Sequence, residues 1–230
     1  MNIFSQAFDY FVDGANWSGP TGIVARLLEQ LWYSAIAVFF SAIIAVPMGL
    51  AIGHIRKGEV ILVGIVNALR SIPTLGLLTF LVLLIGLGLI SPVIALVLLG
   101  IPSILAGTYA GIANVDRTVV DAANSMGMTQ RQVLFRVEVP NAMPLILGGI
   151  RSATLQVIAT ATIAAYVNLG GLGRYIFDGL ALYRYDRVVV GAILVAVLAL
   201  IIDGILALAV WLSQPGTGRL KFRSGAPAKL

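Results

Sequence analysis

Long apolar runs are the feature of this sequence that most restricts its fold. Four runs can cross a bilayer as helices, at about residues 31–52, 92–112, 145–167 and 188–212. Such a helix needs about 20 mostly apolar residues, because hydrocarbon offers the backbone no hydrogen-bond partner. A fifth run, 60–87, contains Arg70, Ser71 and Pro73, which predict a kink or break. The sequence therefore predicts an all-α integral membrane protein with five transmembrane helices.

Composition excludes several other classes of protein. Of the 230 residues, 59% are hydrophobic and 11% are charged, against roughly 25% charged in soluble domains. The chain has no cysteine and one histidine, His54, so we expect no disulfide scaffold, metal site or cofactor bound by this chain. The net charge is +5, but the basic residues are scattered between apolar runs, so we expect a lipid bilayer and no nucleic acid as partner.

The positions of lysine and arginine predict the orientation, because these residues favour cytoplasmic loops. With five spans, one side receives nine basic residues: Arg56, Lys57, Arg117, Arg131, Arg136, Arg219, Lys221, Arg223 and Lys229. The other side receives three: Arg174, Arg184 and Arg187. We therefore expect an external N-terminal segment, 1–20, a membrane domain, 21–213, and a cytoplasmic basic tail, 214–230. The N-terminus has no basic region before an apolar run, so it does not resemble a signal peptide.

Two glycine pairs have the spacing that lets membrane helices approach closely. Gly49 and Gly53 lie at the end of the first apolar run, 31–52. Gly107 and Gly111 lie in the run 92–112, which is the third along the chain when 60–87 is counted as the second. The alternative is that glycine is simply common in membrane helices. The chain shows no internal repeat, so a second, pseudo-symmetric half would have to come from another chain.

The segment between the third and fourth spans, 114–143, has the pattern of two short helices. Asp116 is a plausible N-cap, and Gly127 suits a helix end with positive φ. Between them, the spacing places four apolar residues on one face: Val119, Ala122, Ala123 and Met126.

Thr129 and Gln132 have the spacing of a capping box, and we expect Pro140 to close the second helix. Its apolar face consists of Val133, Leu134 and Val137. The pattern predicts a helix-turn-helix in the cytoplasm; a hairpin lying on lipid headgroups is the alternative.

Within that segment, Asp121-Ala122-Ala123, then Gly127, then Val137-Glu138-Val139-Pro140 resemble the "EAA" loop of ATP-binding-cassette importer permeases. Asp121 stands where that family usually has glutamate, and two valines replace isoleucine and leucine. Segments 70–73 and 168–173 also resemble the small permeases of osmoprotectant systems for glycine betaine, carnitine and choline. The resemblance covers about residues 27–212.

The resemblance implies a permease subunit that is not itself an enzyme. Its partners would be cytoplasmic ATP-binding subunits, a second permease chain and an extracytoplasmic substrate-binding protein. The chain has no Gly-Lys dipeptide and hence no phosphate-binding loop, so ATP and magnesium would bind to the partner ATPase. The residues implied in coupling to the ATPase are Asp121, Ala122, Ala123, Gly127 and Pro140.

Polar and aromatic residues within the spans are candidates for a translocation path. Ser152, Gln156 and Thr160 recur every four residues along the fourth span. They line a path or, alternatively, form hydrogen bonds between subunits. Further candidates are Asn67 and Ser71 in the second span and two intramembrane aromatic residues whose alternative role is packing, Tyr109 and Tyr166.

Three other functions remain as alternatives. One is the permease of a methionine-type amino-acid importer. Another is an ion-coupled secondary carrier, with Asp203, Arg70 and Glu29 as coupling charges; an ion pair for Asp203 and an Arg70 that reaches the interface are the simpler accounts. The third is an intramembrane enzyme or an assembly subunit without transport; for an enzyme, the chain offers almost no catalytic candidates.

Overall fold

The structure is a computed structural model that describes residues 2–56, 58–167 and 169–214, and within these ranges it contains helices and no β-strand. In chain order the elements are α1 (Ile3–Val12), η1 (Gly14–Trp17), α2 (Ile23–Ile55), α3 (Glu59–Arg70), α4 (Thr74–Ile85), α5 (Ile90–Ala113), α6 (Arg117–Ser125), α7 (Gln130–Val133), η2 (Leu134–Glu138), α8 (Val139–Ala164), η3 (Ala165–Val167), α9 (Gly173–Ala181) and α10 (Tyr185–Leu212). Of the predicted tail, only Gln214 lies among the described residues.

Among the described residues, four helical stretches are long and apolar enough to cross a membrane: α2, α5, the stretch Gln130–Val167 and α10. The helices α3 and α4 together form a fifth candidate, bent by 81° around residues 71–73. The predicted break at Pro73 is therefore present. Most of the helices begin earlier than their apolar runs; α2, for example, begins at Ile23 and not near residue 31. Its first turns carry Arg26, Glu29 and Gln30: Arg26 pairs with Glu29 within the helix, and Glu29 and Gln30 also form hydrogen bonds with residues after position 157.

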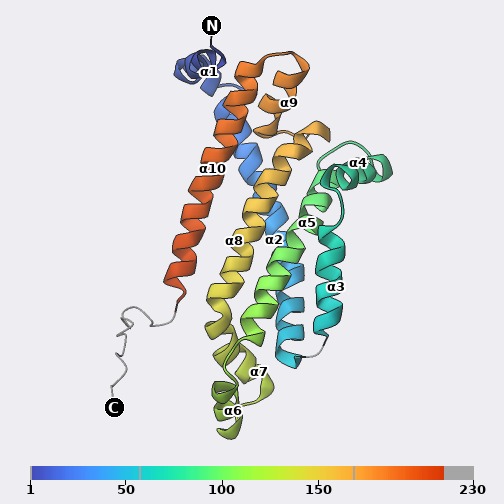
Figure 1. Cartoon of the computed structure of the whole chain (residues 1–230), viewed down its shortest axis with the longest axis vertical. Coiled ribbons are helices and arrows are strands. Elements are labelled where there is room, and N and C mark those ends of the chain that lie inside the picture. The colour runs from blue at the N-terminus through green and yellow to red at the C-terminus, as the bar shows by residue number, and fades with distance from the viewer. Residues whose placement is uncertain (1, 57, 168, 215–230) are drawn as a thin grey trace, which may run out of the picture.

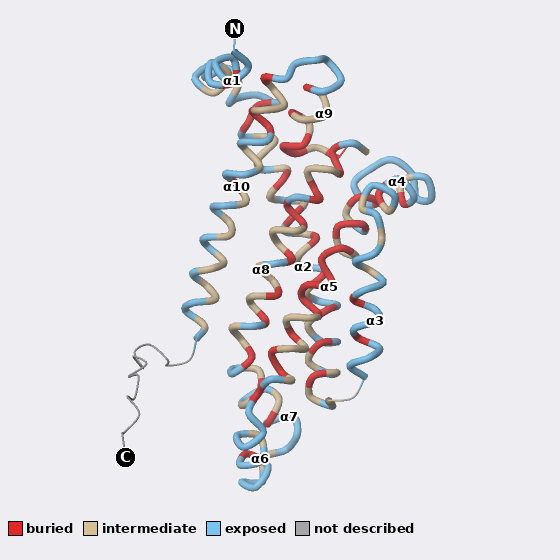
Figure 2. Tube along the Cα trace, in the orientation of Figure 1, coloured by how far each residue is buried: buried red, intermediate tan, exposed pale blue. Residues whose placement is uncertain are grey.

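The helix α5 occupies the centre of the bundle and packs against both α2 and α8 (Figure 1). Figure 2 shows that buried residues concentrate on α5 and on the sides of α2 and α8 that face it. By contrast, α10 buries few of its apolar side chains and leaves the others exposed or partly exposed, as expected for a lipid-facing helix.

Glycines set the distances between these three helices. A Cβ atom built on Gly49 would lie 2.7 Å from the Cβ of Thr108 in α5, and one on Gly53 would lie 2.8 Å from that of Ile112. A Cβ on Gly107 would lie 2.7 Å from the Cα of Gly149 in α8. Both predicted glycine pairs thus mark close helix contacts: the first joins α2 to α5, and the second joins α5 to α8.

The short helices α6 and α7 form one end of the molecule, and α1 and α9 form the other (Figure 1). Asp116 caps α6, with its carboxylate accepting the N–H of Thr118 at 2.9 Å. Gly127 has φ +79° and ends the turn after α6 as the sequence predicts. Thr129 and Gln132 form the predicted capping box at the start of α7.

The expectation that Pro140 closes the second short helix is wrong. Helix α7 continues through η2, a turn of π-helix, directly into α8, and Pro140 is the second residue of α8. A proline lacks an N–H, but the first turn of a helix does not need one. The π-helical turn changes the hydrogen-bond register just before Pro140 and so places the proline in that tolerated position.

Replacing Gly107 by alanine tests the glycine contact. The new methyl group would meet the backbone of α8, which cannot move aside as a flexible side chain can. We expect Gly107→Ala to destabilise the protein by about 1–3 kcal/mol, the usual cost of overpacking. The matched control is Gly148→Ala on α8, where a Cβ meets nothing within 4 Å. Thermal unfolding in detergent should show a lower midpoint for the first variant only; equal midpoints would contradict the close contact.

Candidate functional site

Apolar side chains are exposed at the end formed by α6 and α7. Val119, Ala122 and Met126 share one face of α6, and Met126 is 76% exposed. Phe135, in the η2 turn that packs against α6, is 59% exposed. We call these four residues the tip surface. Ala123, predicted to lie on the same face, is 2% exposed and packs inside the chain, so Ala122 is the alanine available to a partner.

The other predicted residues of this segment have structural places around the tip surface. Asp121 and Pro140 are exposed, and Gly127 makes the turn between α6 and α7. Two hydrogen bonds from Thr118, from its hydroxyl and its N–H, hold the pKa of the Asp116 carboxyl below its usual value. The cap therefore stays charged as the pH falls and keeps α6 in place.

The base of the tip is joined to the end of α2 by a buried pair. The Nδ1 atom of His54 lies 2.5 Å from Oε2 of Glu138, whose side chain is 2% exposed. Nearby, Arg56 donates to the backbone carbonyl of Val115 at 3.3 Å. These two contacts attach both ends of the segment, one before α6 and one after α7, to the same end of α2.

Four of the predicted path residues are exposed. Ser152 lies on α8, and Asn67 and Ser71 lie at the bend between α3 and α4. Tyr166 is 65% exposed and lines an apolar cavity of about 540 Å³ together with residues of α4. Along α8 and η3, exposed residues recur every seven positions: Leu145, Ser152, Ala159 and Tyr166. We call this row the α8 stripe.

The other three predicted path residues lie inside the chain. Gln156 is half-buried and accepts a hydrogen bond from Ser103 of α5 at 3.0 Å. Thr160 is buried, and Tyr109 packs on the apolar cluster between α2, α3 and α5. Gln156 thus forms a hydrogen bond between two helices of the same chain, whereas the alternative from the sequence was a hydrogen bond between subunits, which stays a prediction.

Asp203, the acid in the middle of the last apolar run, is paired. Arg151 of α8 and Asp203 of α10 form two hydrogen bonds, of 2.6 and 2.8 Å, and their side chains are 37% and 29% exposed. A paired charge costs far less in a membrane than a free one. The ion-pair account of Asp203 is therefore confirmed. Arg70 is exposed at the bend after α3.

The glycine-rich segment after α8 is held by two neighbouring residues of α2. Glu29 accepts the N–H of Gly171 at 2.7 Å and pairs with Arg26 at 2.9 Å. Gln30, fully buried, accepts the N–H of Leu172 and donates to the carbonyl of Ile158. Gly171 has φ +85°, and a Cβ there would collide with Gln30. The segment's glycines are thus required by its packing against α2.

Sequence reasoning missed several of these residues. It did not pick out Arg151 as the partner of Asp203, although an arginine inside the run 145–167 was a signal. Nor did it pair His54 with Glu138 or assign Gln30 a role. Their partners are separated by 84 and 128 positions, and no spacing rule reaches so far.

Comparison with known proteins gives a consistent result. The family described as "binding-protein-dependent transport system inner membrane component" matches residues 42–210. A glycine betaine/carnitine/choline transport system permease protein of Bacillus subtilis is 40% identical over 78% of this chain and 82% of its own length. A choline transport system permease protein of the same organism is 37% identical, over 86% and 92%. A carnitine transport permease protein of Listeria monocytogenes is 36% identical, over 79% and 83%.

Solved structures share the fold at lower identity. An inward-facing methionine ABC transporter matches with a TM-score of 0.75 and 21% identity, over 83% of this chain and 95% of the other. An amino acid ABC transporter matches with a TM-score of 0.65 and 19% identity, over 93% and 98%. At these identities the likeness establishes the helical arrangement alone.

The pair of His54 and Glu138 can be tested by a double-mutant cycle. His54→Leu alone leaves the buried carboxyl group of Glu138 without its hydrogen-bond partner, which costs about 1–3 kcal/mol for a buried polar group. In the double variant His54→Leu/Glu138→Leu the unpaired carboxyl group is also removed. The double variant should therefore unfold at a higher temperature than His54→Leu alone. Unfolding free energies that simply add in the double variant would show that the two side chains do not interact.

Proposed function

Since the chain belongs to the family of binding-protein-dependent transport system inner membrane components, we propose that it imports compact quaternary ammonium osmolytes such as glycine betaine, carnitine or choline, as the permease subunit of an ATP-driven system. The observation that carries this proposal is the 40% identity, over 78% of the chain, with a relative named for those three compounds.

The energy for import comes from a separate chain. This sequence has no Gly-Lys dipeptide and so no phosphate-binding loop of the GxxxxGK type; ATP and magnesium bind to a partner ATPase. The tip surface is the contact that we assign to this partner. Its exposed residues Val119, Ala122, Met126 and Phe135 present an apolar patch at the end of the molecule formed by α6 and α7, where water would otherwise meet it (Figure 1).

The orientation follows from the basic residues. The end with α6 and α7 faces the cytoplasm, because Arg117, Arg131 and Arg136 lie there. The end with α1 and α9 faces outward and meets the substrate-binding protein. Of the candidate spans, α3 and α4 act as one broken span, which gives five crossings.

A second permease chain completes the path. The α8 stripe combines small and polar residues, Ser152 and Ala159, and such residues favour helix contacts or a path over plain lipid contact. It leads to the cavity shared by Tyr166 and α4. We therefore place the path along Ser152, Asn67, Ser71 and Tyr166, with Gln156 at its edge and Thr160 and Tyr109 in supporting positions.

The pairing of charges argues against ion-coupled transport. A coupling carboxylate must release its partner during each cycle, yet Asp203 has two hydrogen bonds to Arg151 and Glu29 has two partners. These contacts favour static roles for both acids.

Uptake into liposomes tests the substrate. The chain, its partner ATPase and its binding protein are reconstituted, and labelled glycine betaine is offered with a panel of competing compounds. We expect ATP-dependent accumulation that carnitine or choline reduces and methionine does not. Accumulation of an amino acid, unaffected by quaternary ammonium compounds, would contradict the osmolyte assignment and leave the permease assignment intact.

Gly127→Val tests coupling at the tip. At φ +79° a β-branched side chain strains the turn by about 1–3 kcal/mol, which should displace α6 relative to α7. We expect normal insertion into the membrane and a loss of ATP-driven uptake of about tenfold or more. A factor of ten corresponds to about 1.4 kcal/mol, which lies within the expected strain. The control, Gly127→Asn, tolerates positive φ and should retain most uptake. Full uptake by Gly127→Val would remove this turn from the coupling mechanism.

A further inference from the structure

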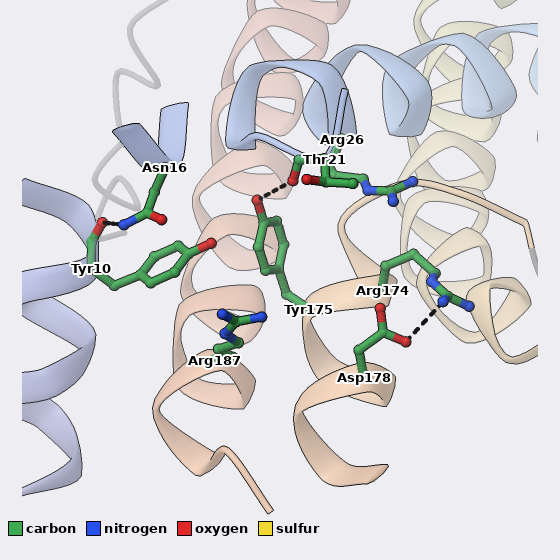
Figure 3. Close-up of a pocket in the computed structure, with 8 residues that line it drawn as sticks. All are labelled: Tyr10, Asn16, Thr21, Arg26, Arg174, Tyr175, Asp178 and Arg187. Atoms are coloured by element: carbon green, nitrogen blue, oxygen red, sulfur yellow. Dashed lines mark hydrogen bonds and ion pairs between the residues drawn. The ribbon is translucent and has the colours of Figure 1, made fainter. Parts of the chain in front are cut away.

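A charged cavity lies at the end of the molecule opposite the tip surface. It has a volume of about 320 Å³ and is formed where α1, η1, the start of α2, α9 and the start of α10 meet (Figure 3). Its size is at the lower end of the roughly 300–1,000 Å³ range of small-molecule pockets, which suits a compact ligand. Three arginines and one aspartate line it: Arg26, Arg174, Arg187 and Asp178.

Of the three arginines, Arg187 has no carboxylate partner among the described residues. Arg26 pairs with Glu29 and Arg174 pairs with Asp178, each at 2.9 Å. The Nε atom of Arg187 is inaccessible to solvent and has no hydrogen-bond partner in the part of the chain that the structure describes. A guanidinium in that state favours an anionic oxygen ligand, which can accept two parallel hydrogen bonds from it.

Two tyrosines complete the cavity beside this guanidinium. The guanidinium carbon of Arg187 lies 5.8 Å from the ring centroid of Tyr10, and the Tyr10 and Tyr175 rings meet edge to face at 6.0 Å. Figure 3 shows Arg187 directed toward the space between these rings. Burial raises the pKa of Tyr175, so its hydroxyl stays neutral, and it donates to the carbonyl of Thr21 at 3.0 Å. Tyr175 therefore adds no negative charge to the cavity.

A second cavity of opposite charge adjoins the first. It has a volume of about 390 Å³ and shares Tyr10 and Asn16 with the first cavity. Its lining includes three carboxylates and one arginine: Asp9, Asp13, Asp186 and Arg184. Arg184 is held by Asp186 through bonds of 2.8 and 3.1 Å, which leaves an excess of negative charge. A guanidinium and an acidic region thus flank the same tyrosine.

We propose that these two cavities form a binding site for zwitterions, in which Arg187 receives the carboxylate and the quaternary ammonium end lies against Tyr10 on its acidic side. The ammonium group gains cation–π attraction to the ring and Coulomb attraction to the carboxylates. This inference rests on the proposed function, which places this end of the chain outside the membrane. The site selects glycine betaine and carnitine over choline, which has the same cation and no carboxylate.

Saturation-transfer NMR on the full chain in nanodiscs tests the site. Three ligands are compared: glycine betaine and two analogues that each lack one of its two charges. Glycine betaine carries both charges, choline lacks the carboxylate, and 3,3-dimethylbutanoate replaces the cationic nitrogen by carbon. We expect glycine betaine to bind at least about tenfold more tightly than either of the others, since each loses one charged contact. Equal affinity for choline would remove the carboxylate site, and equal affinity for 3,3-dimethylbutanoate would reduce the site to an anion site.

Variants assign the binding to this cavity. Arg187→Gln should weaken glycine betaine binding about tenfold and leave choline binding unchanged, while Arg187→Lys should retain part of the affinity. Arg117→Gln removes the same charge at the far end of the chain and should have no effect. Unchanged binding by Arg187→Gln would overturn the assignment. If both Arg187 variants fail to fold, the ligand series on the unaltered chain still decides.

Failure of this inference differs from failure of the proposed function. The NMR experiment needs neither ATP nor partner chains, whereas uptake needs both. A chain that accumulates glycine betaine but shows no carboxylate-dependent binding would lose the outer site and keep its function. A chain that accumulates methionine, and binds methionine as tightly as glycine betaine, would lose the proposed function and the osmolyte selectivity of the site together.

Discussion

Close contact between helix backbones is the constraint on which the rest of this structure depends. In a bilayer, apolar side chains gain little by leaving lipid, so helices associate through packing and hydrogen bonds. Gly49 and Gly53 bring α2 against α5, and Gly107 brings α5 against Gly149 of α8. With the three helices packed together, the tip joins the ends of α5 and α8, and α1 and α9 lie at the opposite end of the bundle (Figure 1).

Much of this architecture could be predicted from local sequence. The apolar runs locate the candidate spans, Pro73 marks the bend, and Gly127 marks the turn with positive φ. These features depend on a few neighbouring residues, whose steric limits are the same in any protein. The prediction for Pro140 was wrong for a related reason. A proline ends a helix only if it lies beyond the first turn, and Pro140 lies in the first turn of α8 because the π-helical η2 directly precedes it. The sequence pattern did not indicate this π-helical turn.

The site could be predicted less well, because it depends on which helices become neighbours. Ser152, Gln156 and Thr160 form a stripe in the sequence, yet the structure exposes the first, half-buries the second and buries the third. An ideal helix turns by 400° in four residues, so this spacing drifts around the axis, whereas the exposed α8 stripe follows a seven-residue repeat. Likewise, the contact between Arg151 and Asp203 depends on the packing of α8 against α10, which the sequence pattern does not indicate.

The proposed orientation places the end with α6 and α7 in the cytoplasm and the end with α1 and α9 outside, and both the ATPase contact and the zwitterion site require it. The chain contains no cysteine, so single cysteines at Ser18, Leu182 and Arg131, all exposed, can report the side directly. With a membrane-impermeant maleimide on intact cells, Ser18→Cys and Leu182→Cys should be labelled, and Arg131→Cys only after permeabilisation. Labelling of Arg131→Cys in intact cells, with the other two protected, would contradict the account.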